Sequence, residues 1–373
     1  MADAHETFMA RAVALAWQGR GDTAPNPCVG SVLVRDGQIV AEGWHHAFGG
    51  PHAERECLAD ARSKGMDVSC CTLYVTLEPC NHHGKTPPCT DAVLEAGISR
   101  VVVGATDPNP VAQGGIEKLR ASGVEVIVGV LKAECRDLIR DFRLWQESDR
   151  AYCILKMAAT LDGRIASRTG DPEAVSCPES FQDVHRLRSQ VGAVMVGGNT
   201  FLQDNPSLTC RLDTDLAKET RQPYAVVLTS RLPGTACELN LIRNRPHQTV
   251  FWTSEENAET GTAQALREIG VRVWGLPWCG KGLDIATGLT RLRQELEVFY
   301  TLCEGGGRLA TALLEQRMAD EFVLYLAPRV LGDEHGVPLF AGRDAPRIRQ
   351  ALDLRLGRSE TSGRDLKLTY YPD

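Results

Sequence analysis

TLEPCNHHGKTPPC, residues 76–89, and HAE, residues 52–54, decide the fold of the first half of this chain. His52, Cys80 and Cys89 offer one imidazole and two thiolates, and three protein ligands leave a tetrahedral Zn²⁺ one open position for water. Glu54 follows the His by two residues and is placed to take a proton from that water and pass it on. We therefore predict that the three ligands converge on one Zn²⁺ per chain and that Glu54 is catalytic.

Two other interpretations of these residues are a closed structural zinc site and three unconnected buried side chains. A structural site needs a fourth thiol or imidazole, for which His82 and His83 are candidates. The catalytic interpretation is favoured because a structural site has no use for Glu54. The pattern H-x-E…P-C…C is typical of zinc deaminases acting on nucleobase-like rings, although here residues 81–88 separate the two cysteines instead of the usual two residues.

Composition limits the classes of protein that remain. A chain of 373 residues exceeds what one hydrophobic core usually organises, so we expect two domains. The chain carries 41 basic and 48 acidic residues, with no run of Lys or Arg, which argues against a nucleic-acid partner and for a small-molecule substrate. We also expect a homo-oligomer, whose order the sequence leaves undetermined.

The N-terminus, the apolar segments and the cysteines indicate the cellular compartment of the protein. The polar N-terminus contains no secretory signal, and no apolar run approaches the length of a membrane span, so we expect no membrane partner. The thirteen Cys are spread over the chain without a disulfide framework. A cytoplasmic protein with reduced thiols is therefore expected.

Strand and helix patterns alternate along the first part of the chain, which predicts a layered α/β sheet. The expected strands are 29–34 and 38–41, joined as a hairpin, and 73–77, 100–104 and 124–128. The expected helices are 8–18, 52–63, 90–96 and 116–121, followed by a single polar helix over 132–146. We place the domain boundary after this last helix and predict domains over 1–147 and 148–373.

The second part alternates in the same way and again predicts an α/β domain. The expected strands are 152–157, 193–196, 224–229, 249–253, 271–274, 298–302 and 322–326. The expected helices are 180–190, 263–269, 287–296 and 309–315.

Several residues of the second part suggest a phosphate-rich ligand. Gly305, Gly306 and Gly307 lie between a predicted strand and a predicted helix, where backbone N–H groups can bind a pyrophosphate, although a tight turn would use the same glycines. Arg188 and Arg211 could clamp a phosphate, with surface salt bridges as the alternative. Ser230 follows the predicted strand 224–229, where it could hold a phosphate group or serve as an ordinary strand cap.

The first domain resembles the pyrimidine deaminase of the riboflavin pathway. The resemblance rests on residues 76–89 and on PNPCVG, residues 25–30. It implies a cytidine-deaminase-like αβα domain with zinc. It also implies that Asn26, His45, His82 and Lys85 contact the ring and the ribose phosphate of the substrate.

The second domain resembles the reductase half of the same pathway's bifunctional enzyme, which has a dihydrofolate-reductase-like α/β fold and uses NADPH. The resemblance rests on residues 155–164, 196–200, 204–211 and 304–307. It implies a substrate site made by Lys156, Arg188, Leu208, Arg211 and Glu304. It implies a cofactor site made by Ala158, Thr200, Asp204, Ser230, Gly305, Gly306, Gly307, Arg308, Leu309, Ala310, Thr311 and Ala312.

One segment departs from that family. Members often carry Gly-x-Ser-x-Trp-Ile where this chain has GDPEAV, residues 170–175, and Pro172 removes a backbone donor. We therefore assign no role to 172–174. The expected function is zinc-dependent deamination of a phosphoribosylated diaminopyrimidine followed by NADPH-dependent reduction of its ribosyl group. The alternative is a nucleobase or tRNA deaminase with a non-catalytic C-terminal module.

Overall fold

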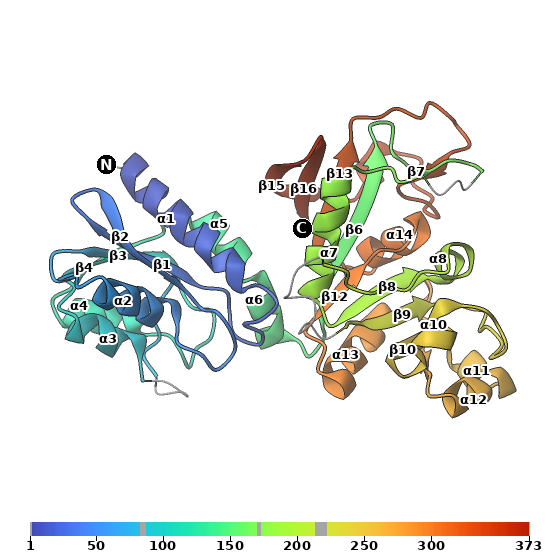
Figure 1. Ribbon diagram of the computed structural model, residues 1–373, viewed down its shortest axis with the longest axis horizontal. Coiled ribbons are helices and arrows are strands. Elements are labelled where there is room, and N and C mark those ends of the chain that lie inside the picture. Colours follow the sequence, from blue (N-terminus) through green and yellow to red (C-terminus); the bar gives the residue numbers. More distant parts are fainter. Residues whose placement is uncertain (1, 83–86, 170–172, 213–221, 373) are drawn as a thin grey trace. The chain divides into compact units, whose positions relative to one another are not determined.

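The chain divides into two compact units, Met1–Ser148 and Asp149–Asp373 (Figure 1). The computed structural model describes residues 2–82, 87–169, 173–212 and 222–372. Within these ranges, no helix combines the length and the apolar character that a membrane crossing requires.

The first unit is built on a sheet of five strands in the order β2-β1-β3-β4-β5. β3, β4 and β5 run parallel, whereas β1 is antiparallel to both of its neighbours. The bounds are β1 Gly30–Arg35, β2 Gln38–Trp44, β3 Thr72–Leu77, β4 Arg100–Ala105 and β5 Glu125–Val128. This sheet agrees with the strands expected from the sequence.

Helices cover both faces of this sheet because successive strand residues point to opposite sides. Leu33, Leu73 and Val101 pack with α2 (Ala53–Ser63), α3 (Cys89–Glu95) and α4 (Gly115–Ala121). Their neighbours Val32 and Tyr74 pack on the other side with α1 (Ala2–Ala16) and α5 (Lys132–Leu138). The result is an αβα sandwich with two apolar layers.

The single helix expected over 132–146 is wrong. The chain forms α5 and then α6 (Arg140–Glu147), with a break at Ile139, whose φ is −112°. Ile139 is buried among Ala16, Leu77 and Phe142. Burial of Ile139 against these side chains therefore determines the local backbone, although the sequence around it has a helical pattern.

Two glycines allow close packing next to predicted metal ligands, of α2 on β2 and of α4 on the chain after β3. A Cβ atom on Gly43 of β2 would lie 2.2 Å from the backbone N of Cys57 in α2. A Cβ atom on Gly115 of α4 would lie 1.9 Å from the carbonyl oxygen of Pro79. Only glycine permits these approaches, because the opposing atoms belong to backbone that cannot move aside cheaply.

The Glu78 carboxylate fixes the chain just after β3. Its Oε1 accepts hydrogen bonds from the backbone N–H groups of Gly114, Gly115 and Ile116, at 3.0, 2.9 and 3.2 Å. Its Oε2 accepts from the N–H of Asp107 at 3.3 Å. The start of α4 and the end of β4 are therefore tied to the residue two positions before Cys80.

The second unit is built on nine strands in the order β11-β10-β9-β8-β12-β6-β13-β16-β15. From β11 to β13 every neighbouring pair is parallel, and β16 and β15 add an antiparallel hairpin at one edge. The bounds are β6 Tyr152–Thr160, β8 Ala193–Gly197, β9 Tyr224–Leu228, β10 Thr249–Ser254, β11 Arg272–Leu276, β12 Tyr300–Cys303, β13 Glu321–Ala327, β15 Leu354–Ser362 and β16 Asp365–Pro372. A small ladder joins β7 Arg164–Ala166 to β14 Val337–Pro338.

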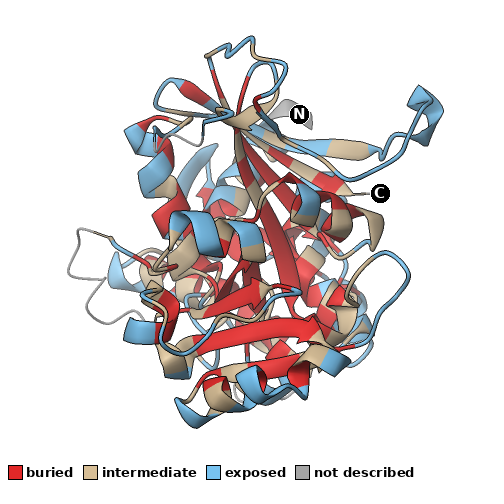
Figure 2. Ribbon diagram, turned by 90° about the vertical axis from the view of Figure 1, so that its right-hand side faces the viewer, coloured by how far each residue is buried: buried red, intermediate tan, exposed pale blue. Residues whose placement is uncertain are grey.

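Helices flank this sheet, and its central strands are buried (Figure 2). The bounds are α7 Pro178–Ser189, α8 Gly198–Asp204, α10 Asn240–Asn244, α11 Glu255–Ala258, α12 Gly261–Glu268, α13 Ile285–Leu296 and α14 Gly307–Glu315. The sequence patterns found the parallel core strands but missed α8, α10, α11 and the hairpin β15–β16. β15 lies mostly exposed at the sheet edge, so it carries little apolar periodicity.

Glu78→Gln tests the tie between the strand end and α4. The substitution places an amide NH₂ group against backbone N–H donors, so we expect a loss of about 1–3 kcal/mol of local stability. Hydrogen exchange of the amides in residues 112–121 should become faster, and Glu95→Gln, at an exposed position of α3, should leave it unchanged. Unaltered exchange in Glu78→Gln would contradict the assignment.

Candidate functional site

The three predicted metal ligands lie together in the first unit. His52 precedes the first turn of α2, Cys80 follows β3, and Cys89 begins α3. The Nδ1 atom of His52 lies 3.5 Å from the Sγ atom of Cys80 and 3.3 Å from that of Cys89. All three ligand atoms lie within 4.8 Å of one another.

This donor set fits a zinc ion. Zn–S and Zn–N bonds of about 2.3 and 2.0 Å in a tetrahedron place a nitrogen and a sulfur ligand roughly 3.6 Å apart. The cluster contains three ligands within the described part of the chain, so His82 does not complete it. His83, the other candidate for a fourth ligand, lies outside the described residues.

The surroundings of Cys80 favour the thiolate form of its side chain. Hydrogen bonds from the Cys89 side chain and from His52 lower the pKa of Cys80. The backbone N–H of Cys89 also donates to Cys80 Sγ at 3.3 Å. A thiolate is the form that binds a metal, and Cys80 is held in that form.

Glu54 lies on the first turn of α2 and is 3% exposed. Burial raises the pKa of its carboxyl group, and the negative charge of Cys80 adds to the effect. A carboxyl group whose pKa is moved toward neutrality can both accept and return a proton at physiological pH.

Asn26 and His45 form a hydrogen-bonded pair beside the ligands. His45 Nδ1 donates to the carbonyl oxygen of Pro51 at 2.9 Å, so Nε2 of the neutral ring accepts from Asn26 Nδ2 at 3.2 Å. Burial lowers the pKa of His45, which favours this neutral form. The ring of His45 meets that of His52 edge to face, with 5.4 Å between centroids.

One cavity of about 230 Å³ collects most of these groups. Asn26, His45, His52, Glu54, Cys80 and His82 line it, together with apolar side chains that include Phe48 and Phe142. The Nδ1 atom of His82 is buried and has no hydrogen-bond partner among the described residues. Lys85, the fourth predicted substrate contact, lies outside the described residues.

The same cavity contains Asp107 and Asn109, which the sequence analysis missed. Burial raises the pKa of Asp107 to about 6, although a hydrogen bond from the N–H of Asn109 opposes the shift. Both residues follow β4, which runs parallel beside β3. The sequence did carry a signal for both residues, since they are polar and follow a predicted strand. The carboxyl ends of parallel strands lie at one edge of the sheet, where ligands usually bind.

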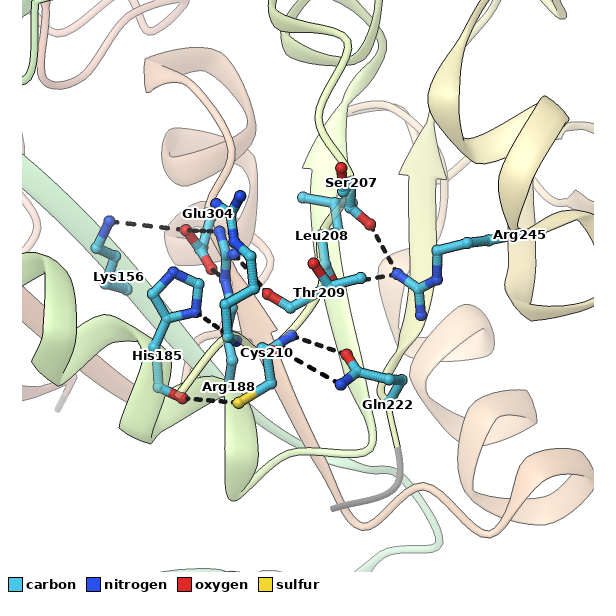
Figure 3. Close-up of polar contacts among 11 residues, drawn as sticks. Lys156, His185, Arg188, Ser207, Leu208, Thr209, Cys210, Gln222, Arg245 and Glu304 are labelled. Carbon is cyan, nitrogen blue, oxygen red and sulfur yellow. Dashed lines mark hydrogen bonds and ion pairs between the residues drawn. The ribbon is translucent and has the colours of Figure 1, made fainter. Parts of the chain in front are cut away.

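In the second unit, three predicted residues form a buried charged cluster (Figure 3). Glu304 follows β12, Lys156 lies on the neighbouring β6, and Arg188 projects from α7. Arg188 donates from Nε to Glu304 Oε1 at 2.6 Å and from Nη2 to Oε2 at 3.1 Å. Lys156 Nζ lies 3.7 Å from Glu304 Oε2.

Burial and the neighbouring charges shift the pKa values of this cluster in opposite directions. Burial raises the pKa of Glu304, but the charges of Lys156 and Arg188 outweigh it, so the pKa is lowered. Burial lowers the pKa of Lys156, and Glu304 opposes this shift. Arg188 is thus engaged by a carboxylate and does not present a free guanidinium for the predicted phosphate clamp. Arg211 is exposed.

The residues predicted for the cofactor lie at the carboxyl ends of neighbouring parallel strands. Ala158 lies on β6, Thr200 and Asp204 lie on α8 after β8, and Ser230 follows β9. A Cβ atom on Gly306 would lie 3.9 Å from Thr200 Oγ1, so the glycine loop after β12 faces α8. This is the edge of an α/β sheet where ligands usually bind.

The residues from Gly305 to Ala312, which were predicted to bind the cofactor, differ in how far they are exposed. Ala310 is fully buried in the core, and Thr311 donates to the carbonyl oxygen of Gly307 at 2.8 Å. Arg308 is exposed, and Gly306, Leu309 and Ala312 are half-buried. Gly305 and Gly307 are also buried, so surface for a ligand is left at Gly306, Arg308, Leu309 and Ala312.

The segment that departs from the reductase pattern is held by Arg329. This guanidinium donates to Glu173 Oε1 at 2.6 Å and to the carbonyl oxygen of Ala174 at 3.0 Å. Residues 170–172 lie outside the described part of the chain.

Comparisons with known proteins agree with both halves. A family model described as the cytidine and deoxycytidylate deaminase zinc-binding region matches residues 2–105, and a RibD C-terminal domain model matches residues 151–368. The riboflavin biosynthesis protein RibD of Aquifex aeolicus is 39% identical over 368 residues, 98% of each chain. That of Escherichia coli is 36% identical and covers 92% of this chain and 94% of its own length.

Solved structures are similar over the whole length. A diaminohydroxyphosphoribosylaminopyrimidine deaminase/5-amino-6-(5-phosphoribosylamino)uracil reductase from Thermotoga maritima is 37% identical with a TM-score of 0.77, covering 100% of this chain and 99% of its own. RibD from Acinetobacter baumannii is 31% identical with a TM-score of 0.73 and covers 100% of both chains.

These matches confirm the predicted fold class, a cytidine-deaminase-like domain followed by a reductase domain of the dihydrofolate-reductase type. They do not favour the alternative of a nucleic-acid deaminase with a non-catalytic module. The chain belongs to the RibD family of riboflavin biosynthesis proteins, bifunctional enzymes that unite a deaminase with a reductase.

Proposed function

We propose that residues 1–147 hydrolyse the exocyclic amine of 2,5-diamino-6-(5-phosphoribosylamino)pyrimidin-4(3H)-one. The observation that carries this proposal is the meeting of His52, Cys80 and Cys89 beside the buried carboxyl of Glu54. Zn²⁺ held by the three ligands supplies Lewis-acid activation of water when it is bound. Water replaces the amine, which leaves as ammonia.

In the deaminase site the protein's own groups move protons and orient the ring. Glu54 takes a proton from the attacking water and gives it to the leaving amine. Asn26 and the neutral His45 orient the pyrimidine, with His45 Nδ1 fixed by Pro51. His82, whose buried Nδ1 has no partner in the described ranges, and Lys85 contact the ring or the ribose phosphate. Phe48 and Phe142 limit access of bulk water to the cavity.

For residues 148–373 we propose reduction of the ribosyl side chain of 5-amino-6-(5-phosphoribosylamino)uracil to ribityl. NADPH supplies the hydride when bound. The Gly305–Gly307 loop offers backbone N–H groups to the pyrophosphate, and Ala158, Thr200, Asp204, Ser230 and the outward residues of α14 surround the rest. Glu304, held by Arg188, accepts from ring N–H groups, while Lys156, Leu208 and Arg211 position the sugar phosphate.

The remaining parts of the proposal concern setting and partners. Small phosphoribosylated pyrimidines are the substrates, with no nucleic acid involved, consistent with the excess of acidic residues. A cytoplasmic homo-oligomer containing one Zn²⁺ per chain is proposed. A two-step assay with the diaminopyrimidine, NADPH and metal analysis tests the whole assignment.

Glu54→Gln tests the proton shuttle. The amide cannot carry the proton, so deamination should fall by about 10²- to 10⁴-fold while one metal ion per chain is retained. The measurements are ammonia release and mass-spectrometric metal analysis. Glu56→Gln, on the same helix but outside the cavity, is the control and should retain activity. Full activity in Glu54→Gln would refute the role.

Cys89→Ser tests the ligand set. A hydroxyl is a poor substitute for a thiolate ligand, so the purified variant should lose most of its zinc, and deamination should fall in proportion. Cys70→Ser, at an exposed position, provides the matched control and should keep its metal. Stoichiometric zinc in Cys89→Ser would show that Cys89 is not a ligand.

Glu304→Gln separates the two activities. Loss of the carboxylate leaves Lys156 and Arg188 without their shared anion, and a hydrogen bond to a charged group contributes about 1.5–3 kcal/mol, so reductase kcat/KM should fall roughly 10- to 100-fold. Deamination should be unchanged. The measurement is NADPH oxidation with the deaminated pyrimidine, with Glu295→Gln on α13 as control. Equal loss of both activities would indicate a general folding defect instead.

A further inference from the structure

Ser207 to Arg211 form an irregular segment that side chains hold in place. No backbone–backbone hydrogen bond joins residues 207–211 to another described residue. Leu208 has a φ of +50°, a left-handed conformation that costs an L-residue of this kind on the order of 1 kcal/mol or more. The surrounding structure must therefore impose this conformation.

Arg245 binds the segment from one side (Figure 3). Its Nη1 donates to the carbonyl oxygens of Ser207 at 2.7 Å and Leu208 at 3.2 Å, and its Nη2 donates to that of Pro223 at 2.5 Å. Nε and Nη2 also reach Gln248 Oε1 at 3.2 and 3.1 Å. Within the part of the chain that the structure describes, these acceptors are all neutral, and three of them are backbone carbonyls.

Gln222 binds the next part of the segment. Its Oε1 accepts from the N–H of Cys210 at 2.9 Å, and its Nε2 donates to the carbonyl oxygen of the same residue at 3.1 Å. The side-chain amide thus replaces a neighbouring strand and satisfies both backbone groups of Cys210.

The opposite side of the segment meets the charged cluster (Figure 3). Arg188 donates from Nη1 to the carbonyl oxygen of Thr209 at 2.9 Å, using the same guanidinium that holds Glu304. His185, on the same helix, accepts from the N–H of Arg211 at Nδ1, 3.0 Å away. The segment is therefore fixed between Arg245 and Gln222 on one side and the proposed reductase site on the other.

We propose that Arg245 and Gln222 are positioning residues for the reductase. They hold the backbone of 207–210 so that the buried Leu208 supports the exposed Arg211, which meets the phosphoribosyl pyrimidine beside Glu304. The inference rests on the proposed reductase function. It assigns substrate affinity to two side chains that lie across the segment from the charged cluster.

Arg245→Met, Arg245→Lys and the matched control Arg243→Met test this role. Arg243 lies on α10 and pairs with Glu238. In Arg245→Met the KM for the pyrimidine should rise about tenfold or more, while kcat and the KM for NADPH stay within about twofold. Arg245→Lys should recover part of the affinity, since one ammonium can still reach a carbonyl. Arg243→Met should behave as wild type.

Gln222→Glu provides a second, nearly isosteric test. It keeps the acceptor for the N–H of Cys210 but sets a carboxylate oxygen against its carbonyl, so the pyrimidine KM should again rise selectively. Hydrogen exchange at the amides of Cys210 and Arg211 should become faster in Gln222→Glu and in Arg245→Met.

The outcomes separate this inference from the function on which it rests. An unchanged pyrimidine KM in both variants overturns the positioning role, as does a loss shared equally by kcat, both KM values and thermal stability. Wild-type protein that deaminates but never oxidises NADPH with the deaminated pyrimidine overturns the reductase function itself, and the inference with it.

Discussion

Parallel pairing of neighbouring strands is the constraint on which both sites depend. It brings the carboxyl ends of those strands to one edge of the sheet. Residues that are distant in sequence therefore lie close together there. In the first unit β3 and β4 deliver Cys80 and Asp107 to one cavity. In the second unit β6 and β12 bring Lys156 beside Glu304. The helices that follow the strands then contribute Cys89 and the glycine loop.

The two sites solve the problem of buried charge differently. The deaminase cavity collects groups that exchange protons or bind metal, and burial lowers the pKa of His45 there, which favours the neutral ring whose Nδ1 donates to Pro51. The reductase cluster instead keeps Glu304 ionised between two cations. Removal of one partner from such a cluster leaves an uncompensated charge, which is more costly than the intact arrangement.

The sequence predicted the deaminase site better than the reductase site for a physical reason. His52, Glu54, Cys80 and Cys89 are rare ligand and acid–base types at short spacings, so their chemistry is visible before folding. Asp107 and Asn109 join them only through the pairing of β3 with β4, which residue type alone does not reveal. Arg188 and Glu304 are separated by 116 positions, and the phosphate clamp predicted for Arg188 did not anticipate their ion pair. Core strands were predicted because they are apolar, whereas the exposed β15 and the break at Ile139 depend on tertiary packing.

Gly43 and Gly115 limit the substitutions that this domain can accept during evolution. A methyl group at either one would collide with main-chain atoms of the helix or loop that carries a metal ligand. Neither glycine lines the cavity, yet each sets the distance between a helix and the chain segment packed against it near the metal ligands. We expect positions 43 and 115 to accept as few substitutions as the metal ligands do, because a larger side chain would change the spacing of the ligands.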